Sequence, residues 1–416
     1  MIGLVNRKLR WLLVIPALIV GVPAGLYLTR DFQAHRRLDE QIRLARMDGI
    51  SMSAAEIAKL VPTARPEENA GLFYKKLKYK APSDFSQVTK MASFDRSAKA
   101  QLARKKILED ARADLALLDA GTKLPHCWFD RDWNLGAAVL FPELRALRTG
   151  SKLLGLRGSL AAQAGDHRAA LGDADRIFKI SDHLQEEGSQ LGDMISITLY
   201  RTGLDQLSKW SFAYPSEPTY RAALAARLGK FKARSLKRQH ADDLWILLNT
   251  LDQSTTREGL AEVGLKPEDA PPLDRIMPLF LNRTDAKATI IRNYRLIWEQ
   301  LGQPKPNEKV IGDAKTEMLK SSFAYPSGIN IYSKLVGGEG GTFEYMDRDM
   351  QHVAFAGQMK FVAVSRALAG GKMAKSIKTS DLIGPNGKPI SYSFDGNTIK
   401  ITTHRDDGDS TYKLPP

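Results

Sequence analysis

The sequence predicts a mainly α-helical protein. It has an N-terminal membrane helix, a body of antiparallel helices forming a bundle or an array of helical hairpins, and a small C-terminal three-stranded antiparallel β-meander. Three observations lead to this fold class. An uncharged apolar stretch lies near the start, apolar residues then recur at helical spacing through most of the chain, and strict alternation appears only at its end. The predicted domains are an anchor at 1–30, a helical domain at 31–265, a second helical segment packed on it at 266–375, and the meander at 376–416.

Composition is that of a globular protein. The chain has 416 residues, of which 43% are hydrophobic and 26% charged, so wholesale disorder is not indicated. It contains one cysteine, which excludes an internal disulfide framework and a zinc site made of several cysteines.

The first predicted element is a membrane helix from Trp11 to Leu28, "WLLVIPALIVGVPAGLYL", which carries no charge. Its length is near the minimum for crossing a bilayer, and basic residues flank both ends. Trp11 and Tyr27 suit the two membrane–water interfaces, and the two prolines inside would kink the helix. We therefore expect an uncleaved signal-anchor and a single-pass protein.

Two alternatives to an anchor stay open at this point. Val22-Pro23-Ala24 has the small residues of a signal-peptide cleavage site, and cleavage there would release a soluble exported protein. A buried helix of a soluble protein is the other alternative, although its basic flanks argue against it. Because a short basic tail before a first apolar segment usually stays inside, we expect the bulk of the chain to lie outside the cytoplasm.

Several helices are expected before residue 121. A charged helix follows the anchor and ends at Gly49, and "SAAE" at 53–56 is a capping box that opens a short helix. Pro66 suits the first turn of a helix over "PEENAGLFYKKLKYKA". A long helix is expected over about 96–120.

The stretch 137–211 predicts three helices. Gly165-Asp166 turns the chain from the first into the second, which reaches about Glu187, and Asp166 is a plausible N-cap. Short connections favour antiparallel neighbours. The apolar stripes are Leu140, Leu144, Leu147, Leu154 and Ala161 in the first helix, and Ile197, Leu204, Leu207 and Trp210 in the third.

Beyond residue 217, helices are expected at 218–232, at 236–256, around an apolar stripe from Ile290 to Leu301, and at 344–368. The proline-rich stretch 266–274 is the best internal boundary. In the tail, apolar residues alternate on both sides of Asp395-Gly396, and a second Asp-Gly pair precedes a third strand. Three short strands bury little alone, so one face should lie on a helix ending near Leu368.

The segment "LPHCWFDRDW", residues 124–133, concentrates reactive side chains. A hydrolase-like site using His126, Cys127 and Asp130 is one interpretation, but neighbours in sequence usually point in different directions. The preferred interpretation is structural: Cys127, Trp128, Phe129 and Trp133 pack at the entrance to the 137–164 helix. Asp130, Arg131 and Asp132 then face water.

No recognised catalytic, nucleotide-binding or zinc motif occurs in the chain. The sequence therefore assigns no catalytic, cofactor-binding or metal residue and predicts no cofactor.

The formal net charge of +14 comes from two local stretches, 75–106 and 227–238. Aromatic residues interleave with the lysines, as in nucleic-acid binding, but outside the cytoplasm that partner is largely absent. Anionic lipid headgroups are the expected counter-charge, at about 1 kcal/mol per basic residue, and solvated helix faces are the plainest alternative. The candidate residues are Lys75, Lys76, Lys78, Lys80, Arg104, Lys105, Lys106, Lys230, Lys232, Arg234, Lys237 and Arg238.

Four segments carry a resemblance: "ARPEENAGLFY" (64–74), "CWFDRDWNLG" (127–136), "AQAGDHRAAL" (162–171) and "GPNGKPISYSFDGN" (384–397). Their order resembles a loose group of uncharacterised single-anchor bacterial helical proteins ending in a G-x-P-x-x-Y hairpin. The last segment is also similar to the tail of type II secretion pseudopilins. The chain departs from both in having Ile383-Gly384-Pro385 where they have Asp-Pro-aromatic. The resemblance implies an exported, anchored, mostly helical protein and no catalytic residue.

These observations together predict a membrane-anchored, extracytoplasmic helical scaffold or interaction protein, for which a protein in the envelope is one candidate partner. A basic protein that binds lipid surfaces or nucleic acid, and an unrecognised hydrolase-like enzyme, are the alternatives.

Overall fold

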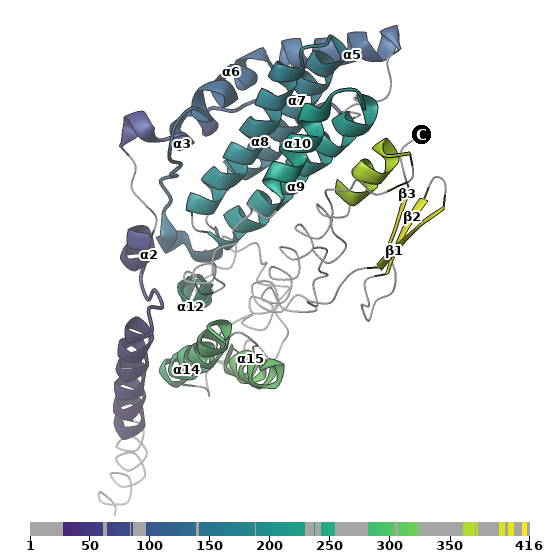
Figure 1. The fold of residues 1–416 in the computed structure, drawn as a ribbon. Coiled ribbons are helices and arrows are strands. Elements are labelled where there is room, and N and C mark those ends of the chain that lie inside the picture. Colours follow the sequence, from purple (N-terminus) through teal and green to yellow (C-terminus); the bar gives the residue numbers. More distant parts are fainter. Residues whose placement is uncertain are drawn as a thin grey trace, which may run out of the picture. The chain divides into compact units, whose positions relative to one another are not determined.

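The computed structural model in Figure 1 describes residues 28–60, 65–83, 85, 97–138, 141–187, 189–228, 237, 243–253, 282–303, 307–322, 325, 361–370, 372, 391–395, 398–402 and 410–413. As predicted, the described chain is mainly helical. It divides into two compact units. Unit 1 comprises Met1–Ala58, Asp132–Val139 and His240–Glu339, and unit 2 comprises Lys59–Arg131, Leu140–Gln239 and Gly340–Pro416. The two units alternate along the chain, whereas the domains predicted from sequence are consecutive.

Unit 2 is built on three long helices: α7 (Pro142–Gln163), α8 (His167–Glu187) and α9 (Gln190–Ala213). Figure 1 shows them side by side, with α8 in contact with both α7 and α9. The predicted stripe residues Leu144, Leu147 and Leu154 are buried in α7, and all four of the α9 stripe are buried as well. The three-helix prediction for this stretch is therefore confirmed, while Leu140 lies outside the described residues.

Two glycines shape the bundle. Gly165, at φ +85°, makes the turn between α7 and α8, and Asp166 caps α8 by accepting a hydrogen bond from the Ala169 N–H (2.9 Å). Gly158 allows α7 to approach α9, because a Cβ there would lie 2.6 Å from the ring of Trp210. The turn and the N-cap were both predicted from sequence.

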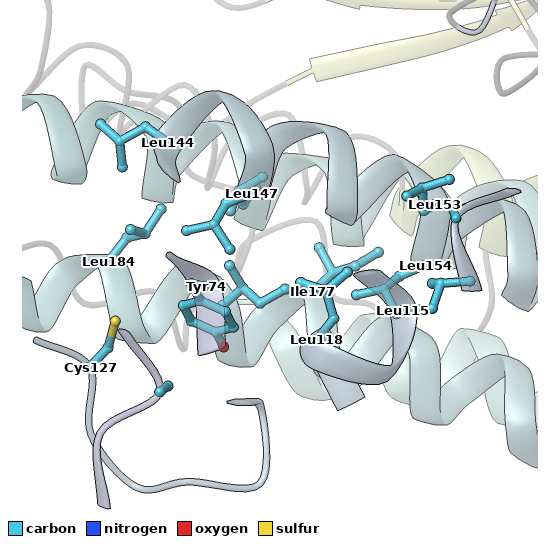
Figure 2. Close-up of a cluster of buried hydrophobic side chains, with 14 of the residues drawn as sticks. Tyr74, Leu115, Leu118, Cys127, Leu144, Leu147, Leu153, Leu154, Ile177 and Leu184 are labelled. Atoms are coloured by element: carbon cyan, nitrogen blue, oxygen red, sulfur yellow. The ribbon is translucent and has the colours of Figure 1, made fainter. Parts of the chain in front are cut away.

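Smaller elements surround the bundle of unit 2. They are η1 (Pro66–Glu68), α3 (Gly71–Tyr74), α5 (Ala98–Asp110), α6 (Arg112–Gly121) and α10 (Pro218–Arg227). Figure 2 shows the core that α3 and α6 share with α7 and α8, including Tyr74, Leu118, Leu147 and Ile177. A second apolar cluster joins α8, α9 and α10 to Val364, in the short helix at 361–368.

The predicted helix over 66–81 is wrong. The chain leaves η1 at Asn69, which forms an isolated parallel bridge with His126, and continues as the single turn α3. Asn69 Oδ1 accepts from the N–H groups of Gly71 (2.9 Å) and Trp128 (2.8 Å). The local bond to Gly71 and the bond to the distant Trp128 replace the helical ones, a competition typical of asparagine.

The predicted single helix over 96–120 is also interrupted. Ala111 separates α5 from α6, with φ −95° and ψ 9°. Asp114, in the first turn of α6, accepts from the backbone N–H groups of Lys78 (3.0 Å) and Tyr79 (2.8 Å). The break therefore lies beside a long-range contact that local spacing does not reveal.

Unit 1 contains a helix over 28–47, α2 (Ala54–Leu60, which crosses the unit boundary at its end), η2 (Trp133–Ala138), α12 (Asp243–Gln253), α14 (Arg283–Leu301) and α15 (Glu308–Ser322). Gly49, at φ +81°, ends the first helix as predicted. Ser53 Oγ accepts from the Glu56 N–H (3.2 Å), which confirms the capping residue of α2. The stripe of α14 from Ile290 to Leu301 is buried, also as predicted.

Three strands lie near the C-terminus: β1 (Ser391–Asp395), β2 (Thr398–Thr402) and β3 (Ser410–Lys413). They pair antiparallel in sequence order, with Ser393 opposite Lys400 and Lys400 opposite Thr411.

Apart from Leu28, the predicted anchor at 11–28 lies outside the described residues. Within the described part, none of the helices combines the length and apolar character needed to span a bilayer. The predicted boundary at 266–274 and most of the predicted helix at 344–368 also lie outside it.

Candidate functional site

The segment 124–133 is the natural place to look for chemistry. On one side its backbone pairs with residues 68–70: the Ala70 N–H donates to the His126 carbonyl (2.8 Å), and the His126 N–H donates to the Glu68 carbonyl (3.2 Å). Gly71 permits this approach, because a Cβ on it would lie 2.1 Å from the Trp128 carbonyl oxygen. The backbone of the segment is thus fixed by a short parallel pairing.

Helix α8 holds the other side of the segment through Lys179, His183 and Glu186. The spacing of four and three residues places these side chains on one helical face. Lys179 Nζ donates to the Pro125 carbonyl (3.0 Å), His183 Nε2 bonds the Leu124 carbonyl (3.0 Å), and Glu186 Oε2 accepts from the Cys127 N–H (3.1 Å). Three backbone groups of the segment therefore find partners on α8, as buried backbone requires.

Cys127 belongs to the core of unit 2. Its side chain is 1% exposed, and Figure 2 shows it at the edge of the cluster that includes Leu144 and Leu184. Phe129 is buried in the same cluster. The structural interpretation of these two residues is confirmed, and Trp133 is buried as well.

His126 is not part of the apolar cluster that holds the Cys127 thiol. Its ring is half exposed, and Nδ1 lies 3.5 Å from Glu186 Oε2. Asp130 and Asp132 are exposed. Among the residues that the structure describes, no three His, Cys, Asp or Glu side chains are grouped so as to hold a metal ion.

Arg131 was expected to face water, and this expectation is wrong. Its side chain is buried and forms an ion pair with Glu143, in the first turn of α7. The guanidinium also lies over the rings of Phe141 (4.1 Å to the centroid) and Phe129 (5.1 Å). Charge pairing and cation–π contacts together compensate the burial of a group that is normally solvated.

His183 is a buried titratable group of this region that the sequence analysis missed. Nε2 faces a carbonyl and therefore carries the hydrogen, so Nδ1 accepts from the Tyr74 hydroxyl (2.9 Å). Burial, with Lys179 nearby, lowers the pKa of His183 to about 3. Burial likewise raises the pKa of Tyr74. Both groups are neutral at pH 7, and the pair acts as a hydrogen-bonded brace between α3, α8 and the segment.

A second polar cluster lies farther along the bundle, between α6, α7 and α8. Arg157 donates two hydrogen bonds to Asp119 (2.7 and 2.9 Å) and bonds Asp173, and Arg176 bonds both carboxylates. Burial opposes ionisation of Asp119, but the arginines outweigh it and lower the pKa of that carboxyl. Two cations and two anions satisfy one another, which identifies this cluster as a structural network.

The predicted basic residues have different outcomes. Lys75, Lys76, Lys78, Lys80, Lys105 and Lys106 are exposed, and Lys237 is partly exposed. Arg104 is only 1% exposed, so its place in an anionic-binding surface is wrong. It shares the inward face of α5 with Ile107, three residues on. Lys230, Lys232, Arg234 and Arg238 lie outside the described residues, as does Trp11.

Comparisons with known proteins return no match, whether to protein-family models, to curated proteins or to solved structures.

Proposed function

We propose that the protein is a single-pass, membrane-anchored helical scaffold or interaction protein whose body lies outside the cytoplasm. The anchor is residues 11–28, and a C-terminal meander packs against the helical body in this proposal. The basis is the uncharged N-terminal stretch together with the side chains that follow it.

The observation that carries the proposal is a pair of exposed apolar side chains, Leu28 and Phe32, in the first turns of the otherwise charged helix over 28–47. Leu28 is 66% exposed and Phe32, one turn later, is 63% exposed. Arg36 lies over the Phe32 ring at 6.0 Å. Large apolar side chains beside arginines are typical of the membrane–water interface, where aromatic rings and basic groups gather.

The same helix is tied to the rest of unit 1. Arg37 pairs with Asp285 (2.9 Å), Asp48 accepts from Arg295 (2.6 Å), and the Trp298 indole N–H donates to the Asp48 carbonyl (2.9 Å). Residue numbers rise together along both helices, so the helix over 28–47 and α14 run in the same direction. An anchor continuous with the first helix would thus be coupled firmly to α14, as a scaffold requires.

The burial of Cys127, the proposed nucleophile, counts against the hydrolase-like alternative. A reactive cysteine needs access and a base in reach, whereas Cys127 is buried among apolar side chains. Its backbone N–H and the neighbouring carbonyls are already bonded to α8. These contacts favour a structural role for residues 124–128.

Membrane retention of the full-length chain tests the proposal. Ile19→Arg with Val20→Arg places two charges at the centre of the apolar stretch, at a cost of about 2.5–3.5 kcal/mol each. We expect this variant to leave the membrane fraction on alkaline washing, while the wild type stays. Met47→Arg, at a side chain that is 71% exposed beyond the anchor, is the matched control and should stay. Release of the wild type, or retention of the double variant, contradicts the proposal.

A further inference from the structure

One surface pattern occurs twice in unit 2. An exposed leucine is followed three and four residues later by exposed lysines, in Leu72-Lys75-Lys76 and in Leu102-Lys105-Lys106. Leu72 is 40% exposed and Leu102 is 71% exposed. We call these two triplets the leucine–lysine faces. Residues at this spacing lie together on one side of a helical turn.

The residue just before each lysine pair points the other way. Tyr74 is fully buried, and Arg104 is 1% exposed. Because the inward side chain is fixed in the core, the leucine and the lysines of each face are held outward. Lys99, three residues before Leu102, is exposed as well and extends the second face.

Both faces are connected to the same apolar cluster of unit 2. The backbone N–H groups of Lys78 and Tyr79, just after the first face, donate to the Asp114 carboxylate of α6. A single residue separates α6 from α5, the helix that carries the second face. Phe73, Leu77, Tyr79 and Leu108 pack against the apolar cluster drawn in Figure 2. The outward lysines therefore stand on a rigid support.

The charge of these faces is not neutralised within the described residues. No ion pair joins Lys75, Lys76, Lys105 or Lys106 to a carboxylate there. Lys75 Nζ reaches the Asp130 carbonyl at 3.5 Å, and Lys76 lies 5.9 Å from the Phe73 ring centroid. The nearby Glu109 pairs with Arg112 instead (3.6 Å).

We propose that the leucine–lysine faces bind the surface of an anionic lipid bilayer. The ammonium groups lie at the lipid phosphates, and the leucine side chains enter the interface, since lysine stems extend along apolar surface while their charges stay in water. The inference rests on the proposed function only in that an anchor keeps unit 2 within reach of a bilayer.

A bilayer fits these faces better than a nucleic acid. Single-stranded nucleic acid is bound by stacking bases on exposed aromatic rings. Here the interleaved rings face the core: Tyr74 is buried, and Phe73 and Tyr79 pack against the apolar cluster. Arg104, the one guanidinium within the two triplet segments, is also buried.

The test uses the full chain in phosphatidylcholine nanodiscs, titrated with phosphatidylglycerol vesicles and with phosphatidylcholine vesicles. Insertion into the nanodisc reports on the anchor, and co-flotation with added vesicles reports on the faces. We expect binding only to phosphatidylglycerol. Replacing Lys75, Lys76, Lys105 and Lys106 with Gln should lower the partition constant roughly 600-fold, at about fivefold per lysine. Leu102→Ser should lower it about tenfold.

Matched controls distinguish binding at the leucine–lysine faces from a general effect of the protein's positive charge. Lys59, Arg168, Arg201 and Lys309 are exposed basic residues on other helices, and replacing all four with Gln should change binding less than tenfold. Leu296→Ser, at a leucine 42% exposed on α14, should change nothing. Circular dichroism and protection of the Cys127 thiol confirm that each variant is folded.

Three results overturn the inference. The first is equal binding to both lipids, and the second is equal losses in the two quadruple variants. The third combines two observations: Leu102→Ser keeps full vesicle binding, and the quadruple lysine variant loses binding to a single-stranded oligonucleotide. Together they would assign the surface to nucleic acid. Failure of nanodisc insertion would instead refute the anchor.

Discussion

Replacing His183 with Gln should remove a pH dependence from the stability of unit 2. In the folded protein His183 stays neutral down to about pH 3, whereas the unfolded residue has its usual pKa of 6.5. Between these values the unfolded chain binds more protons, so stability is fully present above pH 6.5 and falls as the pH falls through the window. From pH 7 to pH 5 the loss is about 2 kcal/mol, which is about 30-fold in the opening equilibrium.

Glutamine is the matched replacement because its amide has both a donor and an acceptor. It preserves an acceptor for the Tyr74 hydroxyl and a donor for the Leu124 carbonyl, and it does not titrate.

The assay is alkylation of Cys127 in the native full-length protein. The thiol is buried beside the segment that His183 braces, so it reacts only when this region opens. Rates are divided by those of a model thiol at each pH. We expect the corrected rate to rise about 30-fold from pH 7 to pH 5 in the wild type, and far less in His183→Gln. Equal pH slopes in the two proteins would refute the assignment of a neutral, buried His183.

Two further predictions concern the packing of unit 2. Gly158→Ala should destabilise the protein by about 1–3 kcal/mol, because its Cβ would lie 2.6 Å from the Trp210 ring. Gly155→Ala should stabilise the helix by up to about 1 kcal/mol, because its Cβ would lie 3.4 Å from the nearest side-chain atom, which is ordinary contact. If thermal unfolding shows the Gly155 variant to be the less stable of the two, the described packing is wrong. Arg131→Met should cost about 3–5 kcal/mol in chemical denaturation by leaving Glu143 buried without its partner, and adding Glu143→Gln should recover part of that loss. No recovery in the double variant would mean that the pair is not coupled.

Periodicity predicted the parts of the fold that local sequence controls. The stripes of α7, α9 and α14 occupy the expected faces, since a helix that buries one side must repeat its apolar residues with a period of 3.6. The turn at Gly165-Asp166 was predictable for the same reason, because its conformation and its cap are both local. The structural role of Cys127 followed from the absence of a recognised motif around it.

The incorrect predictions for the helix over 66–81 and for Arg131 both involve partners beyond the local helical spacing. The helix predicted over 66–81 does not form, because Asn69 accepts a hydrogen bond from Trp128. The Arg131 side chain turns inward because it pairs with Glu143 and lies over the Phe141 ring. The break at Ala111 was hidden because buried residues keep helical spacing across it, from Ile107 to Leu115.

The brace between Tyr74 and His183 left a weak trace in the sequence. His183 lies beside Leu184 and three residues after Ile180, on the buried face of α8. A histidine within an apolar stripe signals a buried polar contact, but its partner is far away in the sequence. Sequence alone therefore suggests that such a residue is bonded and does not say to what.

The most direct measurement of the central claim is the side of the membrane on which the helical body lies. Alkaline phosphatase, which is active only outside the cytoplasm, and a fluorescent protein that matures only inside it are fused in turn after Pro416. An anchored body outside the cytoplasm predicts membrane-bound phosphatase activity and no fluorescence. Fluorescence without phosphatase activity, or either reporter in the soluble fraction, would contradict the account.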